Sequence, residues 1–460
     1  MQKKKETFER VVAMDTHPDT FTAAIVQGPT PAEAIVQKVF NKVPMAQLKK
    51  WAKENVTKND IAVLEASGNS FQIVRDLESI GLRARVLESC QMGKLKEAHA
   101  NNDRISAVRI GKAFLSGTAK EVWVPDPQTQ ERRDWFLAYQ KAVKRTTQIT
   151  NRILSYLSDH NVRLGKKSSL RAIKQKVNKL RSQWTLQQCQ LIDLLLADLE
   201  HAHKQRVQWR SLLAQTVLND PKLLQIVRLC GVRDITAFAI GAVIGDISRF
   251  KSPASLVKYV GLNPAFDDSG KNKWEGGIGG HGRKDLRALL IQGAQAAMRS
   301  KTLPMAQWAR KLMARKSAKN LAVAALARKL AVAIWYVMMG RWTQLEEVEK
   351  ALQTKIGKII GAVGNDILAK LKKNKIKYRQ EIYAALLEGQ TIYMVGPSPA
   401  PAPKDRGFIA LDSSPAAACQ GDKAPRPRFL AETGAQVASQ RSPILRNGNQ
   451  LNTPGAEKKK

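Results

Sequence analysis

The stretch RVVAMDTHPDTFTAAIVQ (residues 10–27) decides the fold of the N-terminal part of the chain. It contains two apolar runs, 10–15 and 20–27, which a short polar segment with a proline separates. Each run has the length and the β-branched and aromatic content that are typical of a strand. A third run, IVQKVF (35–40), follows. We therefore expect the chain to begin with three successive strands.

The segments that follow are expected to alternate between helix and strand. A helix is predicted near 44–54, a strand at IAVLEA (61–66), a helix at about 69–80, a strand at RARVLES (83–89) and a helix that opens at Asp103. Three strands followed by this alternation is the element order of a ribonuclease-H-like domain. The fold class predicted for residues 1–125 is therefore α/β and ribonuclease-H-like.

The remainder of the chain is predicted to be mainly helical. Residues 126–217 have long, charged, amphipathic patterns, which are read either as a solvated helical hairpin or as a coiled-coil arm that oligomerises and contacts phosphates. Residues 218–345 form a second globular unit, with a glycine-dense loop at 269–287. A basic helical extension is expected at 346–395. The Pro/Ala-rich tail, 396–460, contains nine of the 19 prolines and is expected to be disordered.

The charge of the chain points to an anionic partner. A formal net charge of +37 over 460 residues makes DNA or RNA the first candidate, with a generic cationic surface or a membrane surface as the alternatives. An apolar stretch from Leu321 to Met339 is interrupted by Arg328 and Lys329, which argues against a membrane span.

The cysteines and the N-terminal sequence indicate in which cellular compartment the protein is expected. The four cysteines show no zinc-site spacing, and the N-terminus lacks the apolar run of a signal peptide. We therefore expect reduced thiols and a cytoplasmic, nucleoid-associated protein.

Three acidic residues stand where elements of the predicted sheet end or begin. Asp15 ends the first strand, Glu65 ends the IAVLEA strand, and Asp103 opens a helix. Residues at the ends of neighbouring strands converge at one edge of an open sheet, so the three carboxylates can meet. Concentrated negative charge favours a bound cation, and Mg²⁺ prefers such oxygen ligands. The predicted metal site comprises Asp15, Glu65 and Asp103. The histidines, including His17, are treated as surface residues too scattered for a metal site.

The segments VVAMDT, VLEASG and NNDRISA carry a resemblance to a known family. They resemble the DEDD transposases of the insertion sequence 110 family, whose N-terminal domain is similar to that of RuvC-like Holliday-junction resolvases. Asp15, Glu65 and Asp103 match the first three acids of that family. Ser106 stands at the fourth position, and a hydroxyl is a poorer metal ligand than a carboxylate.

A second resemblance lies in CGVRDITAFAIGAVIGDISRFKSPASLVKYVGLNP (230–264) and in the segment DDSGKNKWEGGIGGHGRKDLR (267–287). It is similar to the family's helix-hairpin-helix and Gly-Leu-x-Pro region, followed by a Ser-Gly pair and a Leu-Arg helix. The residues that match are Gly245, Asp246, Arg249, Phe250, Gly261, Leu262, Pro264, Ser269, Gly270, Leu286 and Arg287. Residues 278–282 depart from the family's usual Ile-Ser-Lys-x-Gly.

The resemblance implies that Ser269 attacks DNA and forms a covalent phosphoserine link. A serine hydroxyl needs a base or a cation to become an effective nucleophile. Basic side chains near Ser269 and on the predicted helical arm are expected to bind nucleic acid. These are Lys271, Lys273, Arg283, Lys284, Arg287, Lys166, Lys167 and Arg171.

The resemblance also implies the partners of the protein. These are donor and target DNA, a noncoding RNA encoded by the element that sets sequence choice, and further copies of the chain in a dimer or tetramer. The predicted activity is DNA transposition or recombination with Mg²⁺. The alternatives are a site-specific DNA invertase, a resolvase-like nuclease that uses the acidic site alone, and a nucleic-acid-binding protein weakened in catalysis by Ser106.

Overall fold

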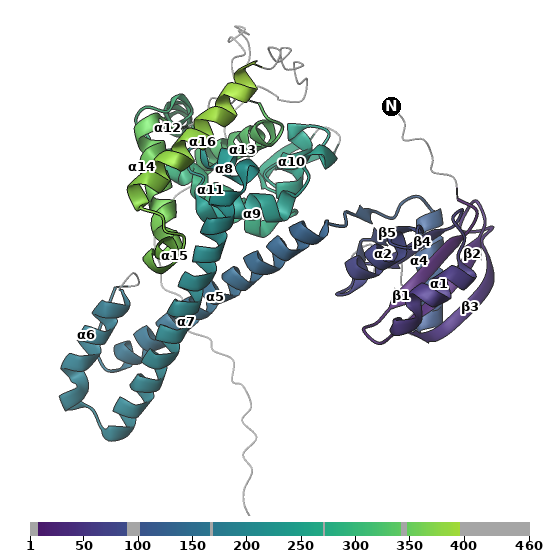
Figure 1. Cartoon of the computed structure of the whole chain (residues 1–460), viewed down its shortest axis with the longest axis horizontal. Coiled ribbons are helices and arrows are strands. Elements are labelled where there is room, and N and C mark those ends of the chain that lie inside the picture. The colour runs from purple at the N-terminus through teal and green to yellow at the C-terminus, as the bar shows by residue number, and fades with distance from the viewer. Residues whose placement is uncertain (1–7, 90–101, 166–168, 270–271, 342–346, 396–460) are drawn as a thin grey trace, which may run out of the picture. The chain divides into compact units, whose positions relative to one another are not determined.

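The computed structural model describes residues 8–89, 102–165, 169–269, 272–341 and 347–395, and the predictions for Cys90, Lys166, Lys167, Lys271 and the tail from 396 fall outside these ranges. The N-terminal part is built on a six-stranded sheet with the order β3-β2-β1-β4-β5-β6 (Figure 1). The strands are β1 (Val11–Thr16), β2 (Thr20–Gln27), β3 (Ile35–Pro44), β4 (Ile61–Glu65), β5 (Arg83–Leu87) and β6 (Glu121–Val122).

The pairing of these strands is mixed. β1, β2 and β3 are antiparallel to one another, β4 and β5 continue the sheet parallel to β1, and β6 closes the edge antiparallel to β5. The predicted mixed α/β domain and its three leading strands are confirmed. β3 extends to Pro44, so the helix predicted near 44–54 begins later, with a 3-10 turn at Met45–Gln47 and then α1 (Leu48–Asn55).

Alternation along each strand divides the sheet into two apolar faces. Val12 and Met14 belong to the cluster that α1 and α2 (Ser70–Glu78) cover. Val11 and Ala13 belong to the cluster that includes Ile110 of α4 (Asp103–Leu115). Successive side chains of a strand point to opposite faces of the sheet, so odd and even positions of β1 pack against different helices. The helices therefore cover both faces of the sheet.

Two long helices follow the sheet. α5 (Pro127–Asp159) begins at the N-cap Asp126 and has proline at its first position, and α7 (Leu186–Asn219) begins with a capping box at Thr185. They run side by side for part of their length (Figure 1). α6 (Leu170–Leu180) packs with their far ends in one apolar cluster.

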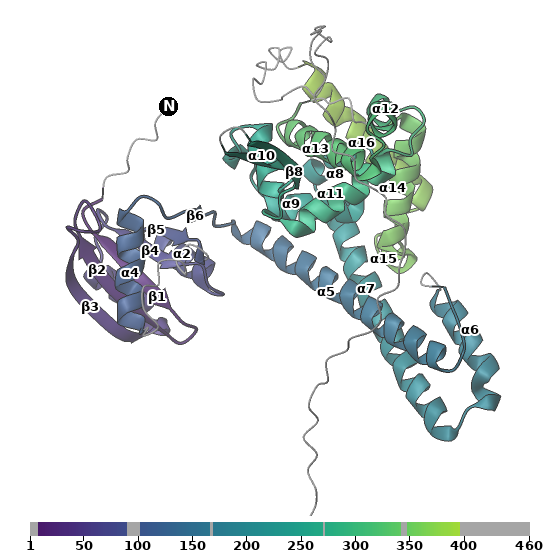
Figure 2. The same ribbon diagram turned by 180° about the vertical axis from the view of Figure 1, so that it is seen from behind.

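The rest of the described chain forms one helical core. Apolar residues of α5, of the end of α7 and of the later helices share a single buried cluster. Figure 2 shows how these helices are arranged. That cluster continues through α14 and α16, across the predicted boundary at residue 345. The later helices are α8 (Pro221–Val227), α9 (Asp234–Ile244), α10 (Pro253–Val260), α11 (Lys284–Ala297), α12 (Pro304–Lys316), α13 (Lys319–Met338), α14 (Glu349–Val363), α15 (Asn365–Lys370) and α16 (Lys375–Val395).

Part of the segment 269–287, predicted as a glycine-dense loop, forms a strand instead. β7 (Pro264–Ser269) and β8 (Asn272–Ile278) pair antiparallel, with Ser269 opposite Asn272. The loop prediction is wrong for the residues of β8. Their sequence alternates poorly between apolar and polar side chains, so the strand pattern is weak.

Among the described residues, one helix is long and apolar enough to cross a membrane by length and composition. It is α13, and 56% of its most apolar window is buried inside the protein. Leu326, Leu330 and Ile334 of this helix are part of the helical core. Such burial is typical of a central core helix.

Candidate active site

Asp15 and Glu65 lie at neighbouring strand ends. The parallel register of β1 and β4 pairs Val11 with Ile61 and ends at Met14 and Leu64, each one residue before an acid. Asp15 is two residues after Ala13, so it lies on the same face of the sheet as Val11 and Ala13. Glu65 lies on the same face as Ile61 and Val63 for the same reason. Both acids are therefore on the face of the sheet that α4 covers.

α4 brings the third acid to the same place. Asn102 caps the helix by accepting a hydrogen bond from the backbone N–H of Ile105, so Asp103 is the first helical residue. Ser106 lies one turn further on, and its hydroxyl donates a hydrogen bond to the Asp15 carboxylate. Ser106, which stands where the resembled family has its fourth acid, thus contacts Asp15, the first acid.

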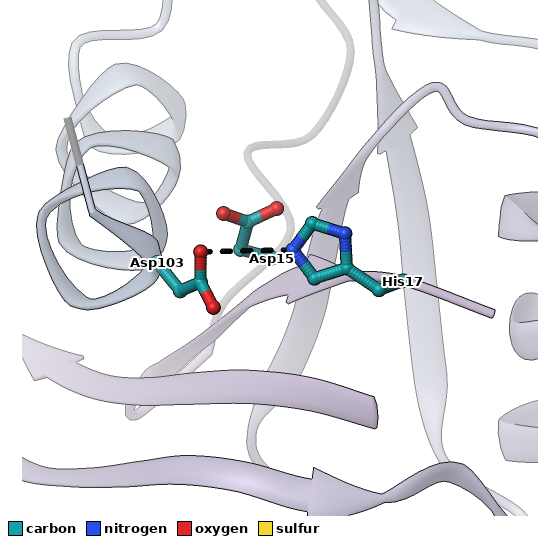
Figure 3. Close-up of side chains that lie close together, drawn as sticks. All are labelled: Asp15, His17 and Asp103. Carbon is teal, nitrogen blue, oxygen red and sulfur yellow. Dashed lines mark ion pairs between the residues drawn. The ribbon is translucent and has the colours of Figure 1, made fainter. Parts of the chain in front are cut away.

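His17 completes the group in space. Its Nε2 lies 3.6 Å from Oδ1 of Asp103, and one ligand atom each of Asp15, His17 and Asp103 lies within 4.8 Å of the other two (Figure 3). The sequence predicts a surface position for His17, and its side chain is 51% exposed although it lies beside two acids of the predicted metal site. Its nearness to Asp15 has a signal in the sequence, since His17 is two residues after Asp15. Glu65 is not part of this close group.

The electrostatics of the group favour a cation. Burial raises the pKa of Asp15 above its usual range, and the Asp103 carboxylate raises it further, while His17 and Ser106 offset part of the rise. A raised carboxylate pKa means that the negative charge is incompletely compensated. Two carboxylates and an imidazole are a donor set that fits a divalent cation.

The Ser269 hairpin is held at its base by backbone contacts. The N–H of Gly279 donates to the carbonyl of Asn263, and the N–H of Arg283 donates to the carbonyl of Tyr259. Nη1 of Arg287 donates to the carbonyl oxygens of His281 at 2.6 Å and of Gly261 at 3.3 Å. These contacts join the residues before β7 to those after β8, so they hold the base of the hairpin that carries Ser269 at its other end.

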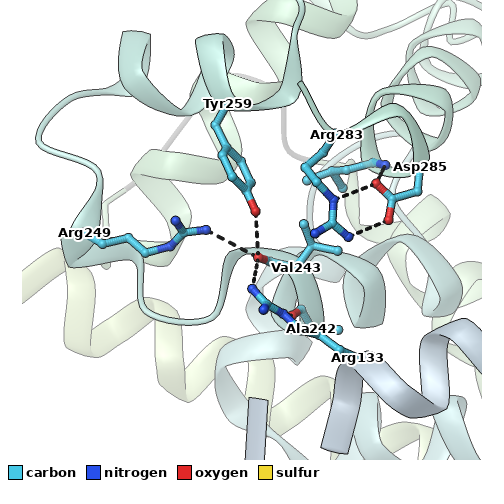
Figure 4. Close-up of polar contacts among 8 residues, drawn as sticks. Arg133, Ala242, Val243, Arg249, Tyr259, Arg283 and Asp285 are labelled. Carbon is cyan, nitrogen blue, oxygen red and sulfur yellow. Dashed lines mark hydrogen bonds and ion pairs between the residues drawn. The ribbon is translucent and has the colours of Figure 1, made fainter. Parts of the chain in front are cut away.

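A cluster of arginines lies beside this base (Figure 4). Arg133 and Arg249 both donate to the last carbonyls of α9, including that of Val243, and the hydroxyl of Tyr259 lies 3.5 Å from the same oxygen. Cationic donors at a helix C-terminus are favourable. Arg283 forms a two-bond ion pair with Asp285, at 2.7 and 3.1 Å. The cluster therefore ties α5, α9 and α10 to the residues that follow the hairpin.

Comparison with known proteins finds similarity to transposases. Residues 225–309 match the family model described as "Transposase IS116/IS110/IS902 family". A "Probable family 20 transposase" of Pseudomonas aeruginosa is 23% identical over 284 residues, which is 60% of this chain and 83% of the relative. The "Transposase for insertion sequence element IS1111A" of Coxiella burnetii is 25% identical over 282 residues, 60% of this chain and 77% of the relative. The chain therefore resembles transposases of the IS116/IS110/IS902 family.

The matched family segment of this chain begins in α8 and ends in α12. It includes the β7–β8 hairpin, Ser269 and Arg287. The acidic group of the sheet lies before that segment, and the alignments with the two relatives extend over a longer part of the chain.

The basic residues of the protein are distributed over several environments. Lys284 is exposed at the start of α11, and Arg171 is exposed on α6. On the arm, Lys174 pairs with Glu200 and Arg181 pairs with Asp193, so α7 neutralises part of the basic cluster expected there. Lys273 lies within β8.

Proposed function

We propose that this protein cuts and rejoins the DNA of an insertion sequence by metal-dependent phosphoryl transfer. The observation that carries the proposal is the meeting of Asp15 and Asp103 on one face of a mixed sheet, with Glu65 at the adjacent strand end. The element order of three antiparallel strands followed by alternating helices and strands supports a ribonuclease-H-like, RuvC-like domain. Similarity to a transposase family supports DNA as the substrate.

The acidic group would hold the cation and the scissile phosphate. Asp15 and Asp103 would be direct ligands, and Glu65 would act from the neighbouring strand end. A bound divalent cation supplies charge that stabilises the attacking and leaving oxygens of a phosphoryl transfer. Ser106 would orient Asp15 by its hydrogen bond, so that the carboxylate keeps a fixed direction towards the cation.

Ser269 is the proposed nucleophile. Its oxygen would bond to phosphorus while the bond from phosphorus to a deoxyribose oxygen breaks, with the serine proton passing to a base and the leaving oxygen taking up a proton. Attack by a deoxyribose hydroxyl of another strand on the phosphoserine would reverse these changes and release the serine. The position of Ser269 at the end of a hairpin in the matched segment supports this assignment.

A noncoding RNA and further copies of the chain are the proposed partners beyond DNA. The charge of +37 supplies affinity for a phosphate backbone but carries no sequence information. A guide RNA would supply that information by base pairing. The acidic site of one copy would act with the serine of another, which requires at least a dimer.

Ser106 favours a second candidate, a DNA-binding protein with weakened catalysis. A hydroxyl replaces a carboxylate at the fourth acidic position, and it contacts Asp15. Fewer charged ligands lower the affinity of a site for Mg²⁺. In that case the protein would bind DNA tightly and cleave it slowly or not at all.

Strand cleavage of element-end DNA distinguishes the two functions. The full-length protein is incubated with labelled DNA, a candidate element RNA and either Mg²⁺ or Mn²⁺, and Asp15→Asn and Asp103→Asn are compared with the wild type. Cation-dependent cleavage that both substitutions remove, with DNA binding intact, supports the transposase. DNA binding without cleavage under either cation supports the weakened protein instead.

A further inference from the structure

His17 stands in the acidic group with a geometry that suits a metal ligand. Its Nε2 and one oxygen each of Asp15 and Asp103 lie within 4.8 Å of one another. In an octahedral shell with bonds of about 2.1 Å, adjacent ligand atoms are about 3 Å apart and opposite ones about 4.2 Å. The separation of 3.6 Å between Nε2 and Oδ1 of Asp103 is between these values. Small side-chain rotations would bring all three atoms onto one cation.

The backbone of His17 is fixed by two hydrogen bonds. Its N–H donates to the carbonyl of Thr20 at 2.9 Å, and its carbonyl accepts from Nδ2 of Asn69, also at 2.9 Å. Oδ1 of Asn69 in turn accepts a hydrogen bond from Ser67, so the loop after β4 supports the turn between β1 and β2. Ligands held by such supporting contacts lose less entropy when a metal binds.

We propose that His17 is a direct ligand of the catalytic cation and that it shifts the site towards a first-row transition metal such as Mn²⁺. This inference rests on the proposed metal-dependent function. Imidazole nitrogen suits transition metals, whereas carboxylate, carbonyl and water oxygens suit Mg²⁺. The sequence prediction of Mg²⁺ rests on three carboxylates, and the structure adds a nitrogen donor to that set.

Ser106 and His17 together define the chemistry of this site. At the fourth acidic position a neutral hydroxyl hydrogen-bonds Asp15, and an imidazole lies on the neighbouring turn. The site therefore has less negative charge than one built from four carboxylates, and it holds a softer donor. The lower charge weakens the binding of either cation, and the nitrogen donor favours Mn²⁺ over Mg²⁺ relative to an all-carboxylate site.

The competing explanation is that His17 only forms a surface ion pair with Asp103. Their side chains are 51% and 36% exposed, and exposed ion pairs contribute little to stability. In that case removal of the imidazole would leave the affinity for Mn²⁺ unchanged, and the bound ion would show no nitrogen ligand.

Electron paramagnetic resonance of Mn²⁺ with the full-length protein, without DNA, tests the inference. Titration measures the affinity, and the pulsed experiment detects coupling to a directly bound ¹⁴N nucleus. The wild type is compared with His17→Ala, with Asp15→Asn, and with His201→Ala, which removes an exposed histidine of α7. His17→Asp serves as a second variant, because it keeps a ligand but replaces nitrogen by oxygen.

We expect ¹⁴N coupling in the wild type and in His201→Ala, and no coupling in His17→Ala or His17→Asp. The affinity for Mn²⁺ should fall about tenfold or more in His17→Ala. His17→Asp should gain Mg²⁺ affinity relative to Mn²⁺. Binding of Mn²⁺ that depends on Asp15 but lacks ¹⁴N coupling, or that is unaffected in His17→Ala, overturns the inference and leaves the proposed function intact. Absence of any Asp15-dependent binding contradicts the metal site itself.

Discussion

Nη1 of Arg287 lies 2.6 Å from the backbone carbonyl oxygen of His281. The same nitrogen also reaches the carbonyl of Gly261, on the other side of the β7–β8 hairpin. One side chain of α11 thus joins the two ends of the hairpin that carries Ser269. The sequence predicts nucleic-acid binding for Arg287, and the structure adds this positioning contact.

Replacement of Arg287 by alanine should loosen the hairpin without unfolding the helical core. The lost hydrogen bonds should cost about 1–3 kcal/mol of stability. Misplacement of a nucleophile by about 1 Å can reduce turnover about 100-fold. Hydrogen exchange should rise selectively in residues 259–283. Gln292→Ala, at an exposed position of α11, is the control, and unchanged exchange in Arg287→Ala would rule out the positioning role.

Gly261→Ala should destabilise the same region through the backbone. Gly261 has φ of +78°, and a Cβ atom built there would lie 1.9 Å from the carbonyl oxygen of His281. Left-handed strain alone costs about 1–3 kcal/mol, and the contact with backbone adds to it. Thermal unfolding should show a lower Tm than in Gly280→Ala, where nothing lies within 4 Å of the added Cβ. Equal melting of the two variants would show that the base of the hairpin tolerates a side chain.

The Arg10–Asp60 pair should make the N-terminal domain sensitive to acid. Arg10 donates two hydrogen bonds to Asp60, at 2.7 and 3.0 Å, and the Asp60 side chain is fully buried. Burial raises the pKa of Asp60, but the hydrogen bonds from Arg10 and Thr57 outweigh it, so the pKa lies below its usual value. The pair therefore stabilises the fold fully above about pH 4 and loses that contribution as the pH falls through the folded pKa.

Asp60→Asn should remove this acid-dependent component of stability. Breaking a buried pair costs about 3–5 kcal/mol at neutral pH. Chemical denaturation at several pH values measures the effect, with Asp19→Asn, at an exposed position, as the control. Identical pH dependence in Asp60→Asn and the wild type would refute the assignment.

Ser106→Asp should strengthen cation binding at the acidic group. An added carboxylate beside Asp15 supplies a charged ligand where the hydroxyl now donates a hydrogen bond. The affinity for Mg²⁺ should rise roughly tenfold. Isothermal titration calorimetry measures it, and Ser155→Asp, at an exposed position of α5, controls for added charge. A gain of the same size in both variants would mean that Ser106 does not face the cation.

Local sequence pattern predicted much of the N-terminal domain, because its strands are apolar runs with clear alternation. The helix at Asp103 follows from Asn102, a good N-cap residue. The strand β8 was missed because its residues alternate poorly between apolar and polar side chains. The nearness of His17 to Asp15 follows from their spacing of two residues, whereas its nearness to Asp103 depends on the packing of α4 beside β1.

The ion pairs of the arm were missed for a similar reason. A run of lysines and arginines in sequence suggests a free cationic surface. Lys174 and Arg181 instead meet acids of α7 that lie on the neighbouring helix. Only the packing of α6 against α7 brings these residues together, so composition alone overestimates the charge that is free to bind nucleic acid.

Covalent trapping on DNA tests the central claim most directly. The full-length protein is mixed with nicked element-end DNA, a candidate element RNA and Mg²⁺ or Mn²⁺, then denatured and separated on a gel. We predict a protein–DNA adduct that requires the cation, Asp15 and Ser269, and that is absent in Ser269→Ala although this variant still binds DNA. An adduct that persists in Ser269→Ala, or tight DNA binding by the wild type with no adduct under either cation, would contradict the account.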